Sequence, residues 1–200
     1  MRILAIETAT EACSVALFDG TALLDARHEV LGRGHAERLV PMIAELPGKG
    51  RAGEIRVSLG PGSFTGVRIG LAVARALGIA WQAKVVGYPT LALVAAQAGK
   101  AVTVCMNGGH GEWFVQNFTA DGSPETEARS LPPQTAAGGT RHTIIAGNRA
   151  QELAAMLGGD RVARDLLPCA ADALRLSPSH LTSNLTPLYG RPPDASRSGA

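Results

Sequence analysis

The sequence predicts an α/β protein built as two lobes. Short strand-like runs open the chain, a strand, a glycine-rich loop and a long helix follow one another up to about residue 82, and new strand and helix patterns begin near residue 100. A strand that leads through a loop into a helix is the repeating unit of α/β folds. We therefore expect a first lobe at residues 1–99, a smaller α/β lobe at 100–186 and an exposed tail at 187–200.

The composition is that of an ordinary globular protein. Of the 200 residues, 46% are hydrophobic and 18% are charged, so a core can form without disulfides or metal. Aromatic residues make up only 4% and the net charge is +2, which is a weak signal for nucleic-acid binding. The three cysteines are unpaired in sequence, the apolar run after Arg2 is too short for a secretion signal, and no run reaches the roughly 20 apolar residues of a membrane span. These features indicate a cytoplasmic protein with no membrane contact.

The first three strands are expected at residues 3–6, 13–18 and 21–29. Asp19-Gly20 lies between the second and third runs, and both residue types tolerate the positive φ of a hairpin turn. The chain therefore opens with a β-meander.

A helix is expected at residues 35–46, because its apolar residues recur at the spacing of one helix face. Pro41 should kink this helix or mark an irregular first half, and Pro47-Gly48 should end it. A strand at 55–59 then leads into the glycine-rich loop 60–66 and a helix to about Gln82.

The second helix carries one narrow polar line, Arg68, Arg75 and Gln82, on an otherwise mostly apolar surface. A helix that is apolar nearly all round is covered either by its own domain or by a partner. The glycines of this helix indicate close packing against its backbone, since each costs about 1 kcal/mol relative to alanine. We favour a helix–helix interface with a partner; the alternative is an internal helix wedged against the sheet.

The second lobe is expected to contain short elements and an irregular end. A strand at 84–87 and a helix at 90–98 precede it. Its strands are expected at 101–105, 112–118 and 143–146, with a helix at 151–157 and irregular chain after Pro178.

The loop at residues 60–66 has two interpretations. Free amides, a positive helix end and Arg68 could bind an anion, although the Lys and Ser or Thr of a P-loop are missing. Ser63 and Thr65 are equally good helix caps, which would make the loop a matter of capping and tight packing. The sequence favours neither over the other.

Glu7, Thr8 and Thr10 at the first turn are the candidate nucleotide or phosphate contacts, since a carboxylate and hydroxyls can hold magnesium-bound phosphate. The alternative, which we favour, is a surface turn with hydroxyl–backbone hydrogen bonds.

Other catalytic chemistries lack their residues. No histidine pair has the i, i+4 spacing of a helical metal site, and Ser63 lacks the glycine two residues before it that a nucleophile elbow requires. We therefore assign this chain no catalytic and no metal-binding residue.

Four blocks of the sequence, in this order and spacing, resemble the TsaB (YeaZ) family, relatives of TsaD. They are residues 3–10 (ILAIETAT), 13–17 (CSVAL), 35–41 (HAERLVP) and 60–70 (GPGSFTGVRIG). The resemblance covers roughly the first 95 residues, and the glycine-rich block is the most specific part.

The resemblance implies the two-lobed actin, hexokinase and Hsp70 fold, which is ribonuclease H-like, with a reduced C-terminal lobe. It also implies a non-catalytic subunit that docks on and activates the catalytic subunit TsaD, with TsaE, in the formation of threonylcarbamoyladenosine at position 37 of tRNA. tRNA would then be contacted only through the complex, and ATP with magnesium is left open at the interface of the complex. The expected partner interface is the glycine block and its helix: Gly60, Gly62, Ser63, Phe64, Thr65, Gly66, Arg68, Gly70, Val73, Ala74 and Leu77.

Three positions depart from the family pattern. Glu7 stands where Asp is usual, Asn107 to Gly109 replace an Asp-Ala-Arg-like block, and Gly190 replaces the Leu of a Pro-x-Tyr-Leu-Arg ending. The histidine pair that holds the metal of TsaD-type relatives is reduced to His35. These departures speak against independent nucleotide chemistry.

Two other functions remain open from the sequence. One is a stand-alone ATPase or phosphotransferase that uses Glu7, Thr8, Ser63 and Thr65 around magnesium. The other is a homodimer that pairs the second helix with itself.

Overall fold

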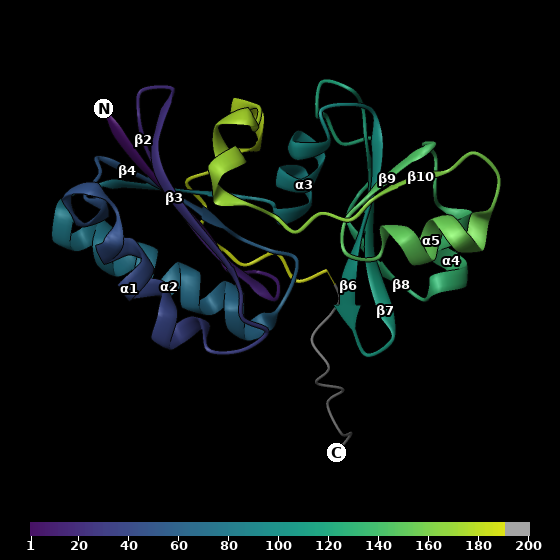
Figure 1. The fold of residues 1–200 in the computed structure, drawn as a ribbon, viewed down its shortest axis with the longest axis horizontal. Helices are drawn as coiled ribbons and strands as arrows, with labels where there is room; N and C mark the ends of the chain where they lie inside the picture. The colour runs from purple at the N-terminus through teal and green to yellow at the C-terminus, as the bar shows by residue number, and fades with distance from the viewer. Residues whose placement is uncertain (191–200) are drawn as a thin grey trace, which may run out of the picture.

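The computed structural model describes residues 1–190 and contains two five-stranded sheets. The sheets stand side by side in Figure 1, with one helix and the C-terminal part of the chain between them. The first sheet consists of β1 Arg2–Glu7, β2 Ala12–Asp19, β3 Ala22–Val30, β4 Glu54–Ser58 and β5 Lys84–Tyr88. The second consists of β6 Val102–Gly109, β7 Glu112–Phe118, β8 Arg129–Leu131, β9 Ile144–Ala146 and β10 Val162–Arg164. The α/β class and the two-lobed arrangement predicted from the sequence are confirmed.

The first sheet has the strand order β3-β2-β1-β4-β5, so β1 is its central strand. β1, β2 and β3 pair antiparallel as the predicted meander, and β4 and β5 extend it in parallel. Asp19 pairs with Ala22, so the turn residues are Gly20 and Thr21 rather than Asp19 and Gly20. Gly20 supplies the positive φ of 57° that the turn requires.

Two helices cover one face of this sheet, α1 His35–Glu45 and α2 Phe64–Trp81. Residues from β1, β2, β4 and both helices form one apolar core there. The opposite face is covered by η2 Ala170–Arg175, a 3-10 turn from the end of the chain. α1 is one continuous helix through Pro41, whose ring lies on the exposed side where the freed carbonyl of Glu37 can bind water.

The second sheet has the order β10-β9-β6-β7-β8 and is covered on both faces. α3 Thr90–Ala98 packs on the face toward the first sheet, while α4 Pro133–Gly138 and α5 Ala150–Leu157 pack on the other. The sequence analysis did not foresee β8, β10 and α4, which are three to six residues long and carry too few residues for a period. α3 precedes residue 99 yet shares its core with the second sheet; the domain limits remain a prediction.

α2 approaches the sheet closely through its glycines. A Cβ at Gly66 would overlap the backbone oxygen of Thr8, and one at Gly70 would overlap the Thr8 hydroxyl. Gly78 lies against Val85 in the same way. The close packing that the glycines predicted is therefore packing within this chain, on one face of α2.

After η3 Pro178–His180, the C-terminal strap (residues 182–190) runs back across the first lobe. Thr182 bridges to Gly87, and the Leu188 amide donates to the Leu59 carbonyl at 2.7 Å. At its end, the Ser130 amide of β8 donates to the Gly190 carbonyl at 3.2 Å. The first residues of the predicted tail thus bind both lobes, and residues 191–200 lie outside the described part of the chain.

Candidate functional site

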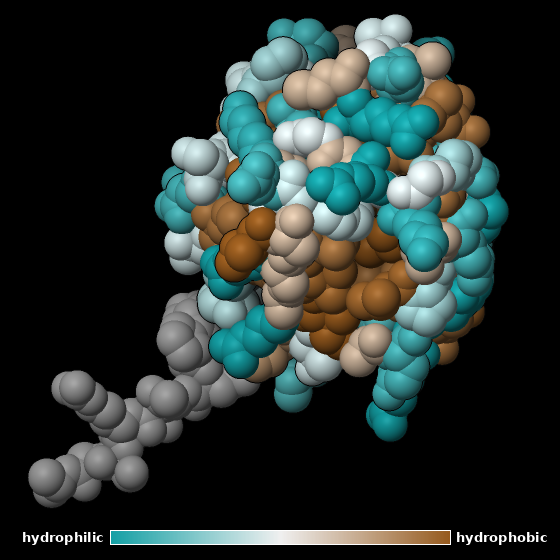
Figure 2. Space-filling view, turned by 90° about the vertical axis from the view of Figure 1, so that its left-hand side faces the viewer, coloured by the Kyte–Doolittle hydropathy of each residue, from teal (hydrophilic) through white to brown (hydrophobic). Residues whose placement is uncertain are grey.

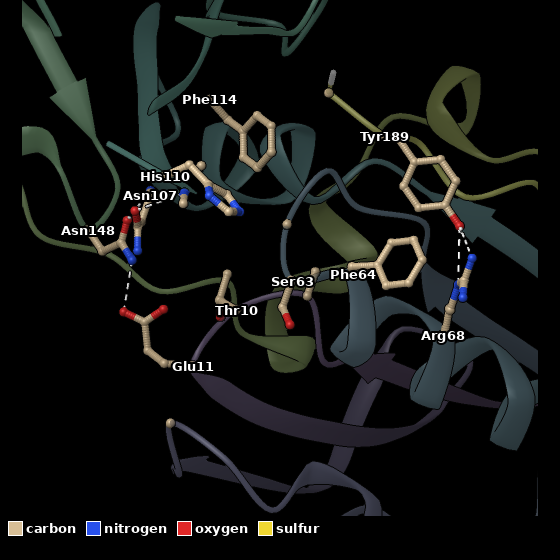
Figure 3. Close-up of a pocket in the computed structure, with 16 residues that line it drawn as sticks. Thr10, Glu11, Ser63, Phe64, Arg68, Asn107, His110, Phe114, Asn148 and Tyr189 are labelled. Atoms are coloured by element: carbon tan, nitrogen blue, oxygen red, sulfur yellow. Dashed lines mark hydrogen bonds between the residues drawn. The ribbon is translucent and has the colours of Figure 1, made fainter. Parts of the chain in front are cut away.

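A pocket of about 910 Å³ opens where the turns of both sheets meet the strap. Figure 3 shows that it is bounded by the β1–β2 turn, the loop before α2, the β6–β7 turn and Tyr189. Every one of these segments is a loop or an element end. The side chains around the pocket therefore come from parts of the sequence that are far apart.

One side of the pocket is a polar chain between the lobes. The Asn148 side-chain amide donates to Glu11 Oε1 at 2.8 Å, and its Oδ1 accepts from the Asn107 amide at 2.8 Å. Asn107 in turn accepts from the Gly109 amide at 3.2 Å (Figure 3). This chain links the β1–β2 turn of the first lobe to the β6–β7 turn of the second.

The opposite side is an aromatic and cationic cluster of Phe64, Arg68 and Tyr189. The Arg68 guanidinium lies 3.6 Å from the Phe64 ring centroid, and its Nε and Nη2 donate to the Tyr189 hydroxyl at 3.3 Å. The Phe64 and Tyr189 rings are 5.5 Å apart. The cluster is exposed to solvent and fixes the guanidinium at the start of α2.

Ser63 caps α2, as one interpretation of the loop predicted. Its Oγ accepts the Gly66 amide at 3.2 Å, which satisfies one of the free donors at the helix start. Thr65 lies in the first turn with its side chain exposed and makes no cap. Anion binding at this loop remains a prediction.

Glu7 and Thr8 lie in the core, with exposed fractions of 0% and 1%. The surface-turn interpretation is therefore wrong for both, because they end the central strand of the sheet under α2. The Thr8 hydroxyl donates to the Gly66 carbonyl at 2.8 Å. Of the three predicted phosphate contacts, only Thr10 lines the pocket.

The Glu7 carboxyl is only half satisfied. Its Oε1 accepts the Ala9 amide at 2.7 Å, while its Oε2 has no hydrogen-bond partner within residues 1–190. Burial raises the pKa of Glu7 to about 7, against the opposing effect of the hydrogen bond from the Ala9 amide. The group titrates near neutrality inside the core.

The predicted interface residues separate by burial. Gly60, Gly66, Gly70 and Ala74 are buried within the same chain, and Gly62, Val73 and Leu77 are half-buried. The side chains of Ser63, Phe64, Thr65 and Arg68 are exposed. A partner would contact the exposed side chains, so the four buried residues would act by shaping the loop and α2 rather than by contact.

Sequence reasoning expected an apolar interface on α2, but its list of interface residues omitted the outermost ones. Ala72, Ala76, Ile79 and Ala80 are exposed there, with Ile79 at 83%. A helical wheel centred on the face opposite the glycines would have found them. No local signal could have found Tyr189, because its hydroxyl meets Arg68 across 121 positions of sequence.

Metal-binding and redox groups are scattered. Within residues 1–190 no three His, Cys, Asp or Glu side chains gather in a metal-binding arrangement. His35 Nε2 lies 3.2 Å from the Ala12 carbonyl, as part of the fold. Burial raises the pKa of Cys13 to about 11 and of Cys105 to about 12, so both thiols stay protonated at neutral pH.

Of the described helices, α2 alone has the length and hydropathy of a membrane span, with a mean hydropathy of 1.3. A third of this helix is buried inside the molecule. The core helices of globular proteins can have the same length and hydropathy. The glycines of α2 fit it to the sheet beneath.

The chain is similar to proteins of one family by sequence and by structure. The TsaD family, described as tRNA N6-adenosine threonylcarbamoyltransferase, matches residues 28–128. The tRNA threonylcarbamoyladenosine biosynthesis protein TsaB of Escherichia coli is 45% identical over 101 residues, or 48% of this chain and 43% of that protein. TsaB of Haemophilus influenzae is 40% identical over 85 residues, which span 38% of this chain and 34% of that protein. The sequence matches thus span less than half the length of these curated relatives.

Solved structures match over nearly the whole chain. YeaZ from Pseudomonas aeruginosa superposes with a TM-score of 0.78 at 30% identity, covering 94% of this chain and 99% of that one. A second Pseudomonas aeruginosa structure, described as similar to peptidase YeaZ, gives a TM-score of 0.79 at 30% identity, with 95% and 99% covered. The ethanolamine utilization protein EutJ of Carboxydothermus hydrogenoformans shares the fold alone, with a TM-score of 0.52 at 10% identity over 88% of this chain and 89% of that one.

The sequence blocks, the α/β lobes and the nearly complete superposition agree with one another. The chain belongs to the TsaB (YeaZ) family of TsaD-related proteins.

Proposed function

We propose that this chain is a non-catalytic subunit in the biosynthesis of threonylcarbamoyladenosine on tRNA, which docks on a TsaD-type catalytic subunit, with TsaE joining them in the cytoplasm. The names of its relatives support the role in threonylcarbamoyladenosine biosynthesis, and the docking role follows from the family resemblance. tRNA would be met only within the complex, and any ATP with magnesium would bind at the complex interface. Self-association through the same helix would compete with docking.

The outer face of α2 is the observation that carries the proposal. Ala72, Ala76 and Ala80 recur every four residues on this face and are exposed beside Ile79. α1 presents a similar exposed row of Ala36, Val40 and Ala44. Figure 2 looks onto the side of the molecule where α1 and α2 lie and shows apolar residues gathered into a patch.

Small exposed residues on two neighbouring helices favour a helical partner. Alanine at every fourth position lets the backbone of another helix approach closely, and the surrounding apolar area then leaves water. Exposed apolar patches of this kind mark protein–protein interaction sites. A helix-to-helix contact on α1 and α2 is therefore the docking mode that we propose.

The rival ATPase is poorly supported by the geometry. Two of its four residues, Glu7 and Thr8, are buried and do not line the pocket. Ser63 is occupied with capping α2. A phosphate in the pocket would meet Thr10 and Arg68, and the acidic side chain that lines the pocket, Glu11, already accepts a hydrogen bond from Asn148.

The test measures binding and tRNA modification with matched variants of exposed alanines. Ala76→Arg places a bulky charge on the α2 face, while Ala155→Arg does the same on the exposed side of α5 in the second lobe. Gly70 is unsuitable for this purpose, because an arginine there would disrupt the core. We expect Ala76→Arg to abolish binding to the TsaD-type protein of the same organism and product formation with it, and Ala155→Arg to preserve both.

Two results would refute the docking role. One is full product in the reconstituted system when this chain is omitted. The other is binding by Ala76→Arg equal to that of Ala155→Arg, with both variants folded by circular dichroism.

A further inference from the structure

The outer face of α2 has a cationic edge with no acidic residue near it in sequence. Arg68 and Arg75 are exposed and lie seven residues apart, which places them on one line about 10 Å long. Between Glu54 and Glu112 the sequence contains no Asp or Glu. The strap and the residues before it, from 173 to 190, contain none either.

Neither guanidinium forms a salt bridge within residues 1–190. Some arginines of the first lobe are paired with acids, since Arg38 lies 2.5 Å from Glu29 and 2.7 Å from Glu45, and Arg56 lies 2.8 Å from Glu54. The two α2 arginines instead contact only neutral groups. Their positive charge is uncompensated on the surface.

The strap holds both guanidiniums in place. Arg68 is fixed by the Tyr189 hydroxyl and the Phe64 ring, and Arg75 Nη2 donates to the Leu185 carbonyl at 3.0 Å. An arginine that is already ordered loses less conformational entropy when it binds a partner. The remaining N–H donors can still face outward, since both side chains are exposed.

The arginines border the apolar surface rather than lying apart from it. At 100° per residue, Arg68 and Arg75 fall directly beside Ile79 and Ala72, with Ala76 next to these. Protein interfaces commonly have an apolar centre and a polar rim that sets the register and the choice of partner. The α2 face has both parts.

We infer that Arg68 and Arg75 form a cationic rim that selects a partner helix carrying two carboxylates about two turns apart. This inference rests on the proposed docking through α2 and names the chemistry of the partner. Each guanidinium would pair with one carboxylate while the alanine row packs against the helix backbone. A second copy of this chain paired α2 on α2 fits less well, because this pairing would bring arginines together without a carboxylate from either α2 helix.

The experiment measures the dissociation constant for the TsaD-type protein of the same organism, with the full chain at low and high salt. Arg75→Glu is the principal variant, since Arg75 contacts only one backbone carbonyl and its loss should leave the fold intact. Arg141→Glu is the control with the same charge change, exposed in the second lobe. We expect Arg75→Glu to weaken binding about 30-fold at low salt and much less at high salt, with the control within about twofold.

Charge-reversal variants of the TsaD-type protein identify the carboxylates that pair with the two arginines. Single Asp→Lys or Glu→Lys changes in the exposed helices of the TsaD-type protein should include one that restores binding to Arg75→Glu and weakens binding to the wild type. Equal binding by Arg75→Glu and Arg141→Glu, with Ala76→Arg still inactive, would overturn the cationic rim and leave the docking face standing. Unchanged binding by Ala76→Arg would instead refute the docking face itself.

A further test measures whether the chain associates with itself. Sedimentation of the chain alone should show a dimer that is weaker than the complex with the TsaD-type protein. A tighter dimer that Ala76→Arg dissociates and Arg75→Glu strengthens would make a second copy the occupant of this face and overturn the inference.

Discussion

Both faces of α2 contain small residues, but the inner face packs against the sheet of this chain and the outer face is exposed. On the inner face Gly66, Gly70 and Gly78 bring the helix backbone onto β1, β4 and β5 of the same chain. On the outer face Ala72 and Ala76 leave the backbone accessible to another molecule. Small residues in a helix therefore indicate that another backbone packs close to it. Only the three-dimensional structure shows whether that backbone belongs to the same chain or to another molecule.

The inner face should be the less tolerant of the two. Gly66→Ala would place a Cβ against the Thr8 carbonyl, which directly follows the central strand β1 and is buried. In most helices Gly→Ala stabilises by about 1 kcal/mol, whereas here overlap with backbone should lower the free energy of unfolding by about 3 kcal/mol or more. Urea denaturation measures this change.

The outer face supplies the control for this substitution. Ala72→Gly, on the same helix, should cost only the ordinary difference in helix propensity, about 1 kcal/mol. If Gly66→Ala proved as stable as the wild type, the inner face would have to be looser than the structure shows.

Glu7 lies at the end of β1 beneath α2, on the inner side of the helix, and should make the stability of this region depend on pH. Its folded pKa of about 7 exceeds the ordinary value of 4.5, so the folded state binds the proton more tightly than the unfolded state. Stability should therefore be greatest below pH 4.5 for this group and fall as the pH rises to about 7, after which the loss is complete. The loss should total about 3 kcal/mol, because each pKa unit corresponds to 1.36 kcal/mol.

The measurement is urea denaturation at a series of pH values for the wild type and Glu7→Gln. The amide stays neutral, so the variant should lose this decline between pH 4.5 and 7. Glu45→Gln is the contrasting variant, since Glu45 pairs with Arg38 and its pKa is lowered. A decline that persists in Glu7→Gln would assign it to other groups.

The sequence predicted the first lobe better than the candidate site. The strands of the meander, α1 and the end of α2 were placed within a residue or two, whereas α2 begins at Phe64, inside the loop predicted at 60–66. Glu7 and Thr8 were placed at a surface turn, because polar residues next to a strand usually end it; their burial under α2 depends on contacts across 58 positions. Tyr189 was assigned to an exposed tail, and its contact with Arg68 depends on the path of the strap.

The Ser63 cap stands at the start of α2, and its removal should lower stability by a moderate amount. Ser63→Ala removes the hydroxyl that accepts the Gly66 amide, so stability should fall by about 1 kcal/mol. Thr65→Ala, in the exposed first turn without a capping bond, should change it by less than about 0.5 kcal/mol. Thermal unfolding of both variants decides whether the loop before α2 contributes stability through this bond.

The smallest effect should come from the strap, where Tyr189→Phe removes a single hydroxyl. The ring would still pack near Phe64, but Arg68 would lose the oxygen to which Nε and Nη2 donate. Affinity for the TsaD-type protein should fall about threefold, because the guanidinium must then be ordered during binding. Stability should hardly change, since the hydroxyl is exposed.

This variant separates positioning of the arginine from a general role of the strap. In an Arg68→Ala background the Tyr189→Phe change should have no further effect on affinity, because the hydroxyl acts only through the guanidinium. Additive losses in the double variant would mean that Tyr189 contacts the partner itself. The outer face of α2 would then continue onto the strap, and the arginines would lie within the contact rather than at its edge.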